Sequence, residues 1–284
     1  MRIEKVLVLP NPEKPAALAC CEKIVSDMRS WGCSADYIPI GEGLHDKITA
    51  CSPELMVVLG GDGSIIDVAR CSAGMDIPIV GVNFGTVGYM AEINHDSPQE
   101  LKKIIEGRYH IQKRMMLDVT IIRSDGRAVS SKYPALNDAV LSNGPIPKLL
   151  EFELYANGRL AHYMRSDGVI ISTPTGSSAY SMSAGGPVMD PELSCICSTP
   201  ICPHHLNNNR PTIFRGRTVL EIRNAKCRDN NIYMSVDGRE VFDIGEGDIV
   251  RISRSAYTTP LVRISNDSFL RLLNTKLSYR PIDS

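Results

Sequence analysis

Short apolar runs alternate with amphipathic segments over the first hundred residues. Such runs predict buried strands at residues 3–9, 55–59 and 77–82. Residues 13–31 carry apolar positions at the helical period, and Gly32 follows as a helix stop. A second helix is expected between Ser97, which begins a capping box completed by Glu100, and Gly107. This alternation predicts an open α/β domain with a mainly parallel sheet.

Beyond about residue 109 the pattern changes to short, closely spaced strands. They are expected at residues 117–123, 136–141, 150–155, 160–165, 169–172, 219–223, 232–236 and 249–253. Asp125-Gly126, Asn157-Gly158 and Asp237-Gly238 predict hairpin turns between them. A helical pattern returns at residues 267–277. We therefore expect an α/β domain over 1–108, a β-rich domain over 109–266, and a helical tail over 267–284 that packs back on the first domain.

Composition and charge narrow the classes of ligand. The chain has 284 residues, 43% of them hydrophobic, with 31 basic against 32 acidic side chains and a net charge of -1. This composition is typical of a globular protein with one or two cores. A nearly neutral chain has no general attraction for nucleic acid or anionic lipid, so phosphate recognition is expected to be local. Small molecules are the expected ligands, and no nucleic-acid or membrane partner is expected.

The cysteines indicate a reducing compartment. There are nine, an odd number, scattered along the chain without an export signal before them, so we expect a cytoplasmic protein. The longest stretch without a charged residue, 168–189, is too rich in Ser, Gly and Pro to cross a membrane. A zinc site built from Cys195, Cys197, Cys202, His204 and His205 is a minor alternative, because the spacing differs from a zinc knuckle. No dedicated metal ligands are assigned.

The first motif that carries chemistry is Gly60-Gly61-Asp62-Gly63-Ser64. It follows a predicted strand and opens a helix expected over 65–70, so its amides lie at a helix N-terminus, where phosphates bind. The glycines are expected to allow close approach and positive φ. The Asp62 carboxylate would repel a phosphate, so its presence here suggests that it binds a metal ion, contacts a hydroxyl or accepts a proton. The alternative is a tight turn in which Asp62 caps the helix.

The second motif runs from Asp167 to Pro187 and reads DGVIISTPTGSSAYSMSAGGP. Its small residues allow close approach, its amides and hydroxyls offer hydrogen bonds to a base edge, and Tyr180 offers a ring for stacking. A flexible serine and glycine linker is the alternative, although a predicted buried strand leads directly into the segment.

These motifs together resemble the NAD kinase family. The loop at 60–64 alone is shared with lipid kinases of the diacylglycerol and sphingosine type and with ATP-dependent phosphofructokinases, and the second motif separates the NAD kinases from both. Further family stretches occur in the family's order at 81–89 (GVNFGTVGY), 135–139 (ALNDA), 199–204 (TPICPH) and Arg210-Pro211. The resemblance implies a C-terminal β-sandwich, and dimers or tetramers whose NAD pocket can include a neighbour's residues.

The resemblance also implies roles for particular residues. Asp62 is expected next to the acceptor 2′-hydroxyl of the adenosine ribose, as the catalytic residue, and Asn137 with Asp138 is expected to contact NAD. The phosphate loop is Gly60, Gly61, Gly63 and Ser64. Further residues expected along NAD are Gly63, Gly88, Tyr89, Asp167, Ser178, Ala179, Tyr180 and Ser183. The implied reaction transfers a phosphoryl group from ATP, with Mg²⁺ or another divalent cation, to NAD and gives NADP.

Departures from the family are mild, and rival functions stay open. Ser64 and Ser178 stand where Thr is commoner in the family, and Tyr89 stands where Phe is commoner. Asp138 replaces the longer Glu, and the loop at 205–209 is one residue longer than usual. A phosphofructokinase is disfavoured because residues 10–15 contain no glycine, and a lipid kinase because Ile66 stands where Asn is usual. The remaining rivals are a non-catalytic NAD(P) sensor and a kinase of this loop type with another acceptor.

Overall fold

The computed structural model describes residues 3–85, 88–144, 149–204, 210–227 and 231–265. The chain divides into two compact units: unit 1, from Met1–Lys113 and Thr259–Ser284, and unit 2, from Arg114–Thr258. The tail predicted to be helical, 267–284, lies outside the described residues, as do Thr86, Val87 and residues 205–209.

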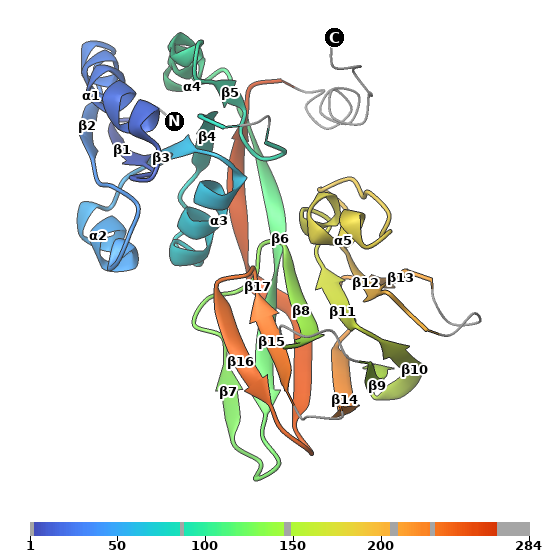
Figure 1. Cartoon of the computed structure of the whole chain (residues 1–284). Coiled ribbons are helices and arrows are strands. Elements are labelled where there is room, and N and C mark those ends of the chain that lie inside the picture. The colour runs from blue at the N-terminus through green and yellow to red at the C-terminus, as the bar shows by residue number, and fades with distance from the viewer. Residues whose placement is uncertain (1–2, 86–87, 145–148, 205–209, 228–230, 266–284) are drawn as a thin grey trace. The chain divides into compact units, whose positions relative to one another are not determined.

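Unit 1 is built on a parallel sheet. Its strands β1 (Lys5–Pro10), β2 (Ser34–Tyr37), β3 (Leu55–Gly60) and β4 (Ile79–Asn83) lie in the order β2-β1-β3-β4 (Figure 1). The short β5 (Ile93–Asn94) pairs with β4, as does the end of β17, where Leu261 lies opposite Ile79. The parallel α/β prediction for this part of the chain is confirmed.

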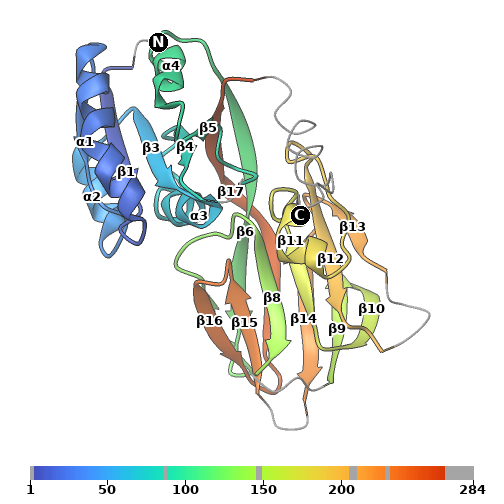
Figure 2. The same ribbon diagram turned by 45° about the horizontal axis from the view of Figure 1, so that its top comes forward.

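Helices cover both faces of this sheet. α1 (Pro15–Ser30) and α4 (Leu101–Ile105) pack on the face that carries Val6, Val57 and Val80. α2 (Leu44–Cys51) and α3 (Asp62–Cys71) lie on the other side (Figure 2), where a Cβ added to Gly81 would meet Ile65 of α3. Alternate strand residues thus face different helices, which explains the continuous apolar runs.

Unit 2 is a sandwich of two mainly antiparallel sheets. One has the order β13-β12-β11-β8-β15-β16, and the other contains β10-β9-β14-β17 with β6 and β7. The strands are β6 (His110–Ile122), β7 (Ala128–Ser130), β8 (Asp138–Asn143), β9 (Leu150–Ala156), β10 (Arg159–Ser166), β11 (Gly168–Ser172), β12 (Cys195–Ile201), β13 (Thr212–Arg215), β14 (Leu220–Lys226), β15 (Ile232–Val236), β16 (Glu240–Ile244) and β17 (Ile249–Arg263). Between β11 and β12 lie a 3₁₀ turn, η2 (Gly176–Ser178), and α5 (Tyr180–Ser183).

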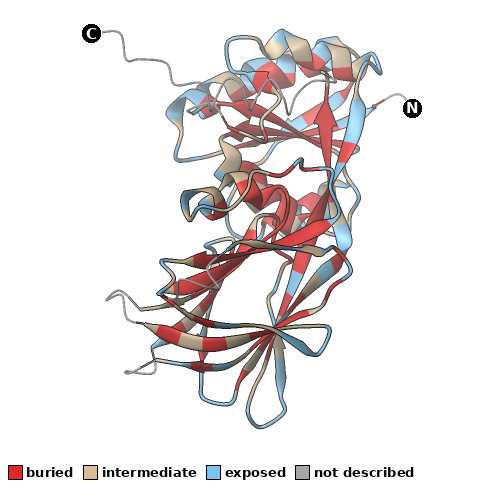
Figure 3. Cartoon of the chain, turned by 90° about the vertical axis from the view of Figure 1, so that its right-hand side faces the viewer, coloured by how far each residue is buried: buried red, intermediate tan, exposed pale blue. Residues whose placement is uncertain are grey.

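One core joins the two sheets of unit 2. Leu141 and Val169 from one sheet cluster with Phe152, Leu154 and Leu220 from the other. Figure 3 shows buried residues along both sheets. The β-sandwich expected from the family resemblance is therefore confirmed.

Several local predictions need correction. The helix expected over 97–107 is a 3₁₀ turn, η1 (Pro98–Glu100), followed by α4. Its capping box does not form, because Ser97 makes no cap bond and its hydroxyl donates to Asp96 at 2.9 Å. The helix expected to begin at 65 begins at Asp62, so the glycine loop supplies its first turn. β17 extends to Arg263, ten residues beyond the strand predicted at 249–253.

Candidate functional site

The glycine loop of unit 1 lies at the carboxyl edge of the parallel sheet, as predicted. β3 ends at Gly60, and α3 begins at Asp62. Gly60 must be small, because an added Cβ would meet the side chain of Ser64. The expected positive φ is wrong, however: Gly61 has φ of −108°, and neither Gly60 nor Gly63 is among the residues with positive φ. Close packing, rather than left-handed backbone, explains the glycine at 60.

The carboxylate of Asp62 is held by another loop of unit 1. It accepts the backbone N–H of Tyr89 at 2.6 Å and that of Met90 at 3.0 Å. Asp62 makes no cap bond to its own helix, so the alternative role as a helix cap is wrong. Gly88 lies so close that an added Cβ would overlap the Asp62 carboxylate. Burial raises the pKa of the Tyr89 phenol, and the charge of Asp62 raises it further.

Two residues at this edge were missed by the sequence reasoning. The Asn11 amide donates to the Ser64 hydroxyl at 2.9 Å, and the Lys14 ammonium donates to the Phe84 carbonyl at 3.1 Å. Both follow β1, whose carboxyl end adjoins that of β3 in the parallel sheet. No motif marks these two residues. Only their position after a parallel strand could have pointed to them, because segments that follow such strands meet at one edge of the sheet.

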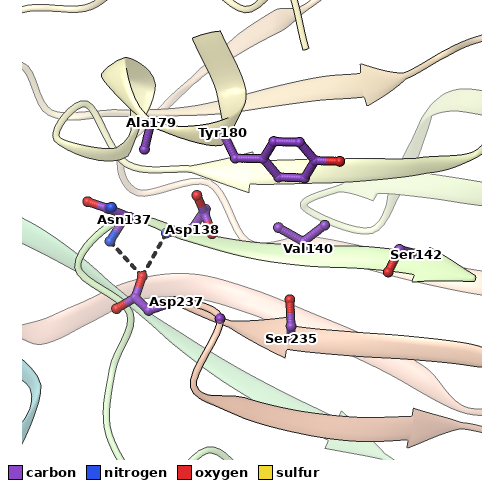
Figure 4. A pocket seen from close by; sticks show the side chains of 9 residues that line it. Asn137, Asp138, Val140, Ser142, Ala179, Tyr180, Ser235 and Asp237 are labelled. Carbon is purple, nitrogen blue, oxygen red and sulfur yellow. Dashed lines mark hydrogen bonds between the residues drawn. The ribbon is translucent and has the colours of Figure 1, made fainter. Parts of the chain in front are cut away.

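A pocket of about 380 Å³ lies in unit 2, on the outer face of the sheet that contains β8 (Figure 4). Asp138, Val140 and Ser142 of β8 point into it, whereas Ala139 and Leu141, which alternate with them, belong to the core. The other lining residues are Asn137, Ala179, Tyr180, Ser235, Asp237 and Gly238. Two-residue strand periodicity thus divides β8 between core and pocket.

Asp237 fixes the backbone on one side of the pocket. Its carboxylate accepts the N–H groups of Leu136, Asn137 and Asp138 at 2.7, 2.8 and 3.0 Å. Figure 4 shows the bonds from Asn137 and Asp138. Its own N–H donates to the Asp138 carbonyl at 2.9 Å. Asp237 and Gly238 both have positive φ, so the predicted turn is present. The sequence signalled the turn, but the clamp joins residues about a hundred positions apart and was missed.

The polar groups of the predicted Asn-Asp pair differ in their surroundings. Burial raises the pKa of Asp138 to about 7, and the nearby Asp237 charge adds to the shift. Asp138 can therefore act as a donor or an acceptor near neutral pH. The side-chain oxygen of Asn137 is buried and has no hydrogen-bond partner among the described residues. Such a group is an acceptor suited to a ligand donor.

The serine and glycine segment packs directly on this pair. Thr173 bonds to the carbonyls of Leu136 and Asn137 through its hydroxyl at 2.6 Å and its N–H at 2.8 Å. An added Cβ at Gly176 would overlap the backbone of Asn137. The segment is ordered into η2 and α5, so the flexible-linker alternative is wrong.

Several hydroxyls of the segment make hydrogen bonds within the protein. Ser177 donates to Pro174 at 2.6 Å and accepts from Met189 at 2.9 Å, and Ser178 donates to Thr175 at 3.2 Å. The Ser181 and Thr199 hydroxyls bond to each other at 2.9 Å. These hydroxyls therefore already have partners within the protein, and their contact with a base edge stays a prediction.

The structure brings together some of the predicted residues. Asn137, Asp138, Ala179 and Tyr180 share the pocket of unit 2. Asp167, Ser178 and Ser183 belong to unit 2 but not to this lining. The antiparallel register places Ser172 opposite Asp138 and Gly168 opposite Ser142, so Asp167 lies near the far end. The predicted residues of unit 1 are Gly60, Gly61, Asp62, Gly63, Ser64, Gly88 and Tyr89.

Within the described residues, no group of three or more His, Cys, Asp or Glu side chains could hold a metal ion. Cys195 and Cys197 lie in β12 and cluster with Met189, and His205 lies outside the described part. Across the described helices, none combines the length and the apolar character needed to cross a membrane.

Comparisons with known proteins agree with these features. The ATP-NAD kinase N-terminal domain model matches residues 24–112, and the ATP-NAD kinase C-terminal domain model matches 136–264. An NAD kinase from Symbiobacterium thermophilum is 36% identical and covers 96% of this chain and 99% of its own length. One from Trichlorobacter lovleyi is also 36% identical and covers 91% of this chain and 94% of its own length.

Solved structures show the same fold. Yeast NADH kinase complexed with NADH matches with a TM-score of 0.86 at 21% identity, over 99% of this chain and 90% of that one. An NAD kinase from Archaeoglobus fulgidus in complex with ATP matches with a TM-score of 0.77 at 22% identity, over 99% of this chain and 100% of that one. The two family models together span most of the chain, and the curated relatives match nearly all of it. The chain therefore belongs to the NAD kinase family.

Proposed function

We infer that this chain phosphorylates NAD at the 2′-hydroxyl of the adenosine ribose, with ATP as donor, to give NADP. The observation that carries this inference is the match to NAD kinases over nearly the whole chain. In this proposal, the glycine loop provides the base and the phosphate contacts, and the pocket of unit 2 binds NAD. The non-catalytic sensor is disfavoured because Asp62 is present and ordered by two backbone amides.

The proposed reaction needs one proton acceptor. The 2′-oxygen forms a bond to the γ-phosphorus of ATP, the bond from that phosphorus to the bridging oxygen breaks, and ADP leaves. We assign Asp62 to accept the hydroxyl proton as the new bond forms. A carboxylate has about four lone-pair positions, and two amide bonds leave positions free for the substrate hydroxyl.

The pocket of unit 2 is assigned to NAD. The free oxygen of Asn137 accepts a donor of the nucleotide, and Asp138 exchanges a hydrogen bond in either protonation state. Tyr180 is 48% exposed, which leaves its ring available for stacking. Asp167, Ser178 and Ser183 remain proposed contacts. They lie outside the lining of this pocket in the single chain. We also propose a dimer or tetramer in which residues of a neighbouring chain complete the NAD pocket.

A divalent cation fits this donor set if it arrives with ATP. Mg²⁺ commonly takes one or two protein carboxylates together with substrate phosphates. The described residues include no ready-made cluster of ligands, and Asp62 is the carboxylate of the glycine loop. When bound, the ion offsets charge on the phosphates, and the loop amides at Gly61 and Gly63 are assigned to the same groups. The Ser64 N–H donates to the Gly61 carbonyl at 3.0 Å, so this residue is assigned to the phosphates through its hydroxyl.

Activity of the purified chain tests the function. NADP formation from NAD, ATP and Mg²⁺ is measured with an NADP-specific dehydrogenase, beside reactions that omit each component. Saturable NADP formation that requires all three supports the proposal. Tight NAD binding without product would support a sensor, and ADP release only with a lipid or sugar phosphate would support another acceptor.

We also propose a cytoplasmic location.

A further inference from the structure

A buried ion pair in unit 1, Arg263 with Glu92, takes no part in the proposed chemistry. Arg263, near the end of β17, has no exposed surface, and the Glu92 side chain is 5% exposed. The Arg263 Nη1 lies 3.0 Å from the Glu92 Oε2. Both residues belong to unit 1, and they are separated by 171 positions in the sequence.

Both side chains of the pair also make hydrogen bonds to backbone groups. Nη1 of Arg263 donates to the Met90 carbonyl at 3.0 Å. Oε1 of Glu92 accepts the N–H groups of Ile264 and Ser265 at 2.9 and 3.1 Å. The N–H of Glu92 itself donates to Gly81 of β4 at 3.0 Å. The pair therefore ties the segment after Gly88 to the returning end of the chain and to the sheet.

Met90 connects this pair to the proposed catalytic carboxylate. Its N–H donates to Asp62 at 3.0 Å, and its carbonyl accepts from Arg263 at 3.0 Å. The peptide groups before and after the Met90 Cα are thus both held, one by Asp62 and the other by Arg263. A shift of the 89–90 backbone would move both amide donors of Asp62 at once.

Stability alone gives little reason for such a pair. Desolvation of two buried charges commonly offsets their attraction, and an apolar pair of similar volume is often as stable. Fixed geometry is a better reason, since reaction rates fall steeply when a catalytic group is misplaced by about 1 Å. We propose that Arg263, with Glu92, is a positioning residue that holds the Tyr89 and Met90 amides and thereby the Asp62 carboxylate.

The test removes the link without leaving an unpaired charge. Arg263→Met combined with Glu92→Gln abolishes both charges but keeps an oxygen for Ile264 and Ser265. We expect kcat to fall about 10- to 100-fold while KM for NAD and ATP stays within about threefold. Amide exchange at Tyr89 and Met90 is expected to rise at least about tenfold. Arg263→Lys with Glu92 intact retains the positive charge on a single nitrogen and is expected to lose less of kcat and of amide protection than the double variant does.

A matched control separates positioning from lost stability. Arg123 of unit 2 pairs with Asp248 at 2.7 Å, so Arg123→Met combined with Asp248→Asn also removes both charges of a partly buried ion pair. It is expected to lower the melting temperature but to keep kcat and the exchange at Tyr89 and Met90. Wild-type kcat in the double variant, or unchanged exchange at both amides, would overturn the proposal.

The proposal rests on the inferred NAD kinase activity, and the two can fail separately. If the wild-type chain makes no NADP, the function fails, and amide exchange alone decides whether Arg263 holds the segment. If the double variant does not fold, Arg263→Lys takes its place. Wild-type kcat and exchange in that variant would then count against positioning, whereas lower kcat with unchanged KM and faster exchange would support it.

Discussion

Removal of the buried carboxyl at Asp138 should change how stability depends on pH. The Asp138 side chain points from β8 into the pocket, is buried and lies near Asp237, and its pKa is raised from 3.8 to about 7. A raised pKa means that the folded protein retains a proton which the unfolded chain has lost. The free energy of unfolding therefore falls as the pH rises from about 4 to about 7, and then levels off.

The magnitude follows from the size of the shift. One pKa unit corresponds to about 1.36 kcal/mol, so a shift from 3.8 to about 7 limits the loss to about 4 kcal/mol. Asp138→Asn cannot ionise and lacks this loss. We expect the variant to gain stability relative to wild type between pH 5 and pH 8, by about 2 kcal/mol or more.

Urea unfolding of the free protein at pH 5, 6, 7 and 8, followed by circular dichroism, measures this difference. Asp248→Asn is the matched control, because hydrogen bonds from Gly245, Arg123 and Ser124 outweigh burial and lower the pKa of Asp248. Its stabilising contribution is lost only as the pH falls below about 4, so its difference from wild type stays constant between pH 5 and 8. A constant difference for Asp138→Asn would refute the reasoning.

Two glycine substitutions test the close contacts of the site. Gly88→Ala places a Cβ against the Asp62 carboxylate, so kcat should fall at least about tenfold with little change in NAD affinity, as measured by steady-state kinetics and calorimetry. Unchanged kcat would show that the 88–90 segment does not fix Asp62. Gly176→Ala pushes on the Asn137 backbone, so NAD binding should weaken and stability should fall by about 1–3 kcal/mol, which calorimetry and urea unfolding measure. Wild-type affinity in that variant would separate the serine and glycine segment from the NAD pocket.

Features with local causes could be predicted from the sequence. The apolar run before Gly60 predicted β3 and the position of the glycine loop, and Asn157-Gly158 forms the expected turn with both residues at positive φ. β2 and α2 were not anticipated. β2 buries only Ala35, and α2 buries only Leu44 and Ile48, too few positions to produce a periodic pattern.

The contacts that complete the site could not be read locally. Asp237 looked like a turn residue, and its role as a clamp depends on amides about a hundred positions earlier. Arg263 and Glu92 carry no motif and meet only because β17 returns to unit 1. Resemblance supplied Asn137 and Asp138, whereas Ser142 and Ser235 required the strand register that places them on the same face.

Turnover by Asp62→Asn, measured beside its affinity for NAD, tests the central claim most directly. Asn retains an oxygen that can accept one amide bond but cannot take up the hydroxyl proton. We expect kcat for NADP formation to fall by about 10²- to 10⁴-fold while the Kd for NAD stays within about threefold. Asp46→Asn, an exposed change on α2, serves as the control and should behave as wild type. Wild-type turnover in Asp62→Asn would contradict the role of this carboxylate as the base.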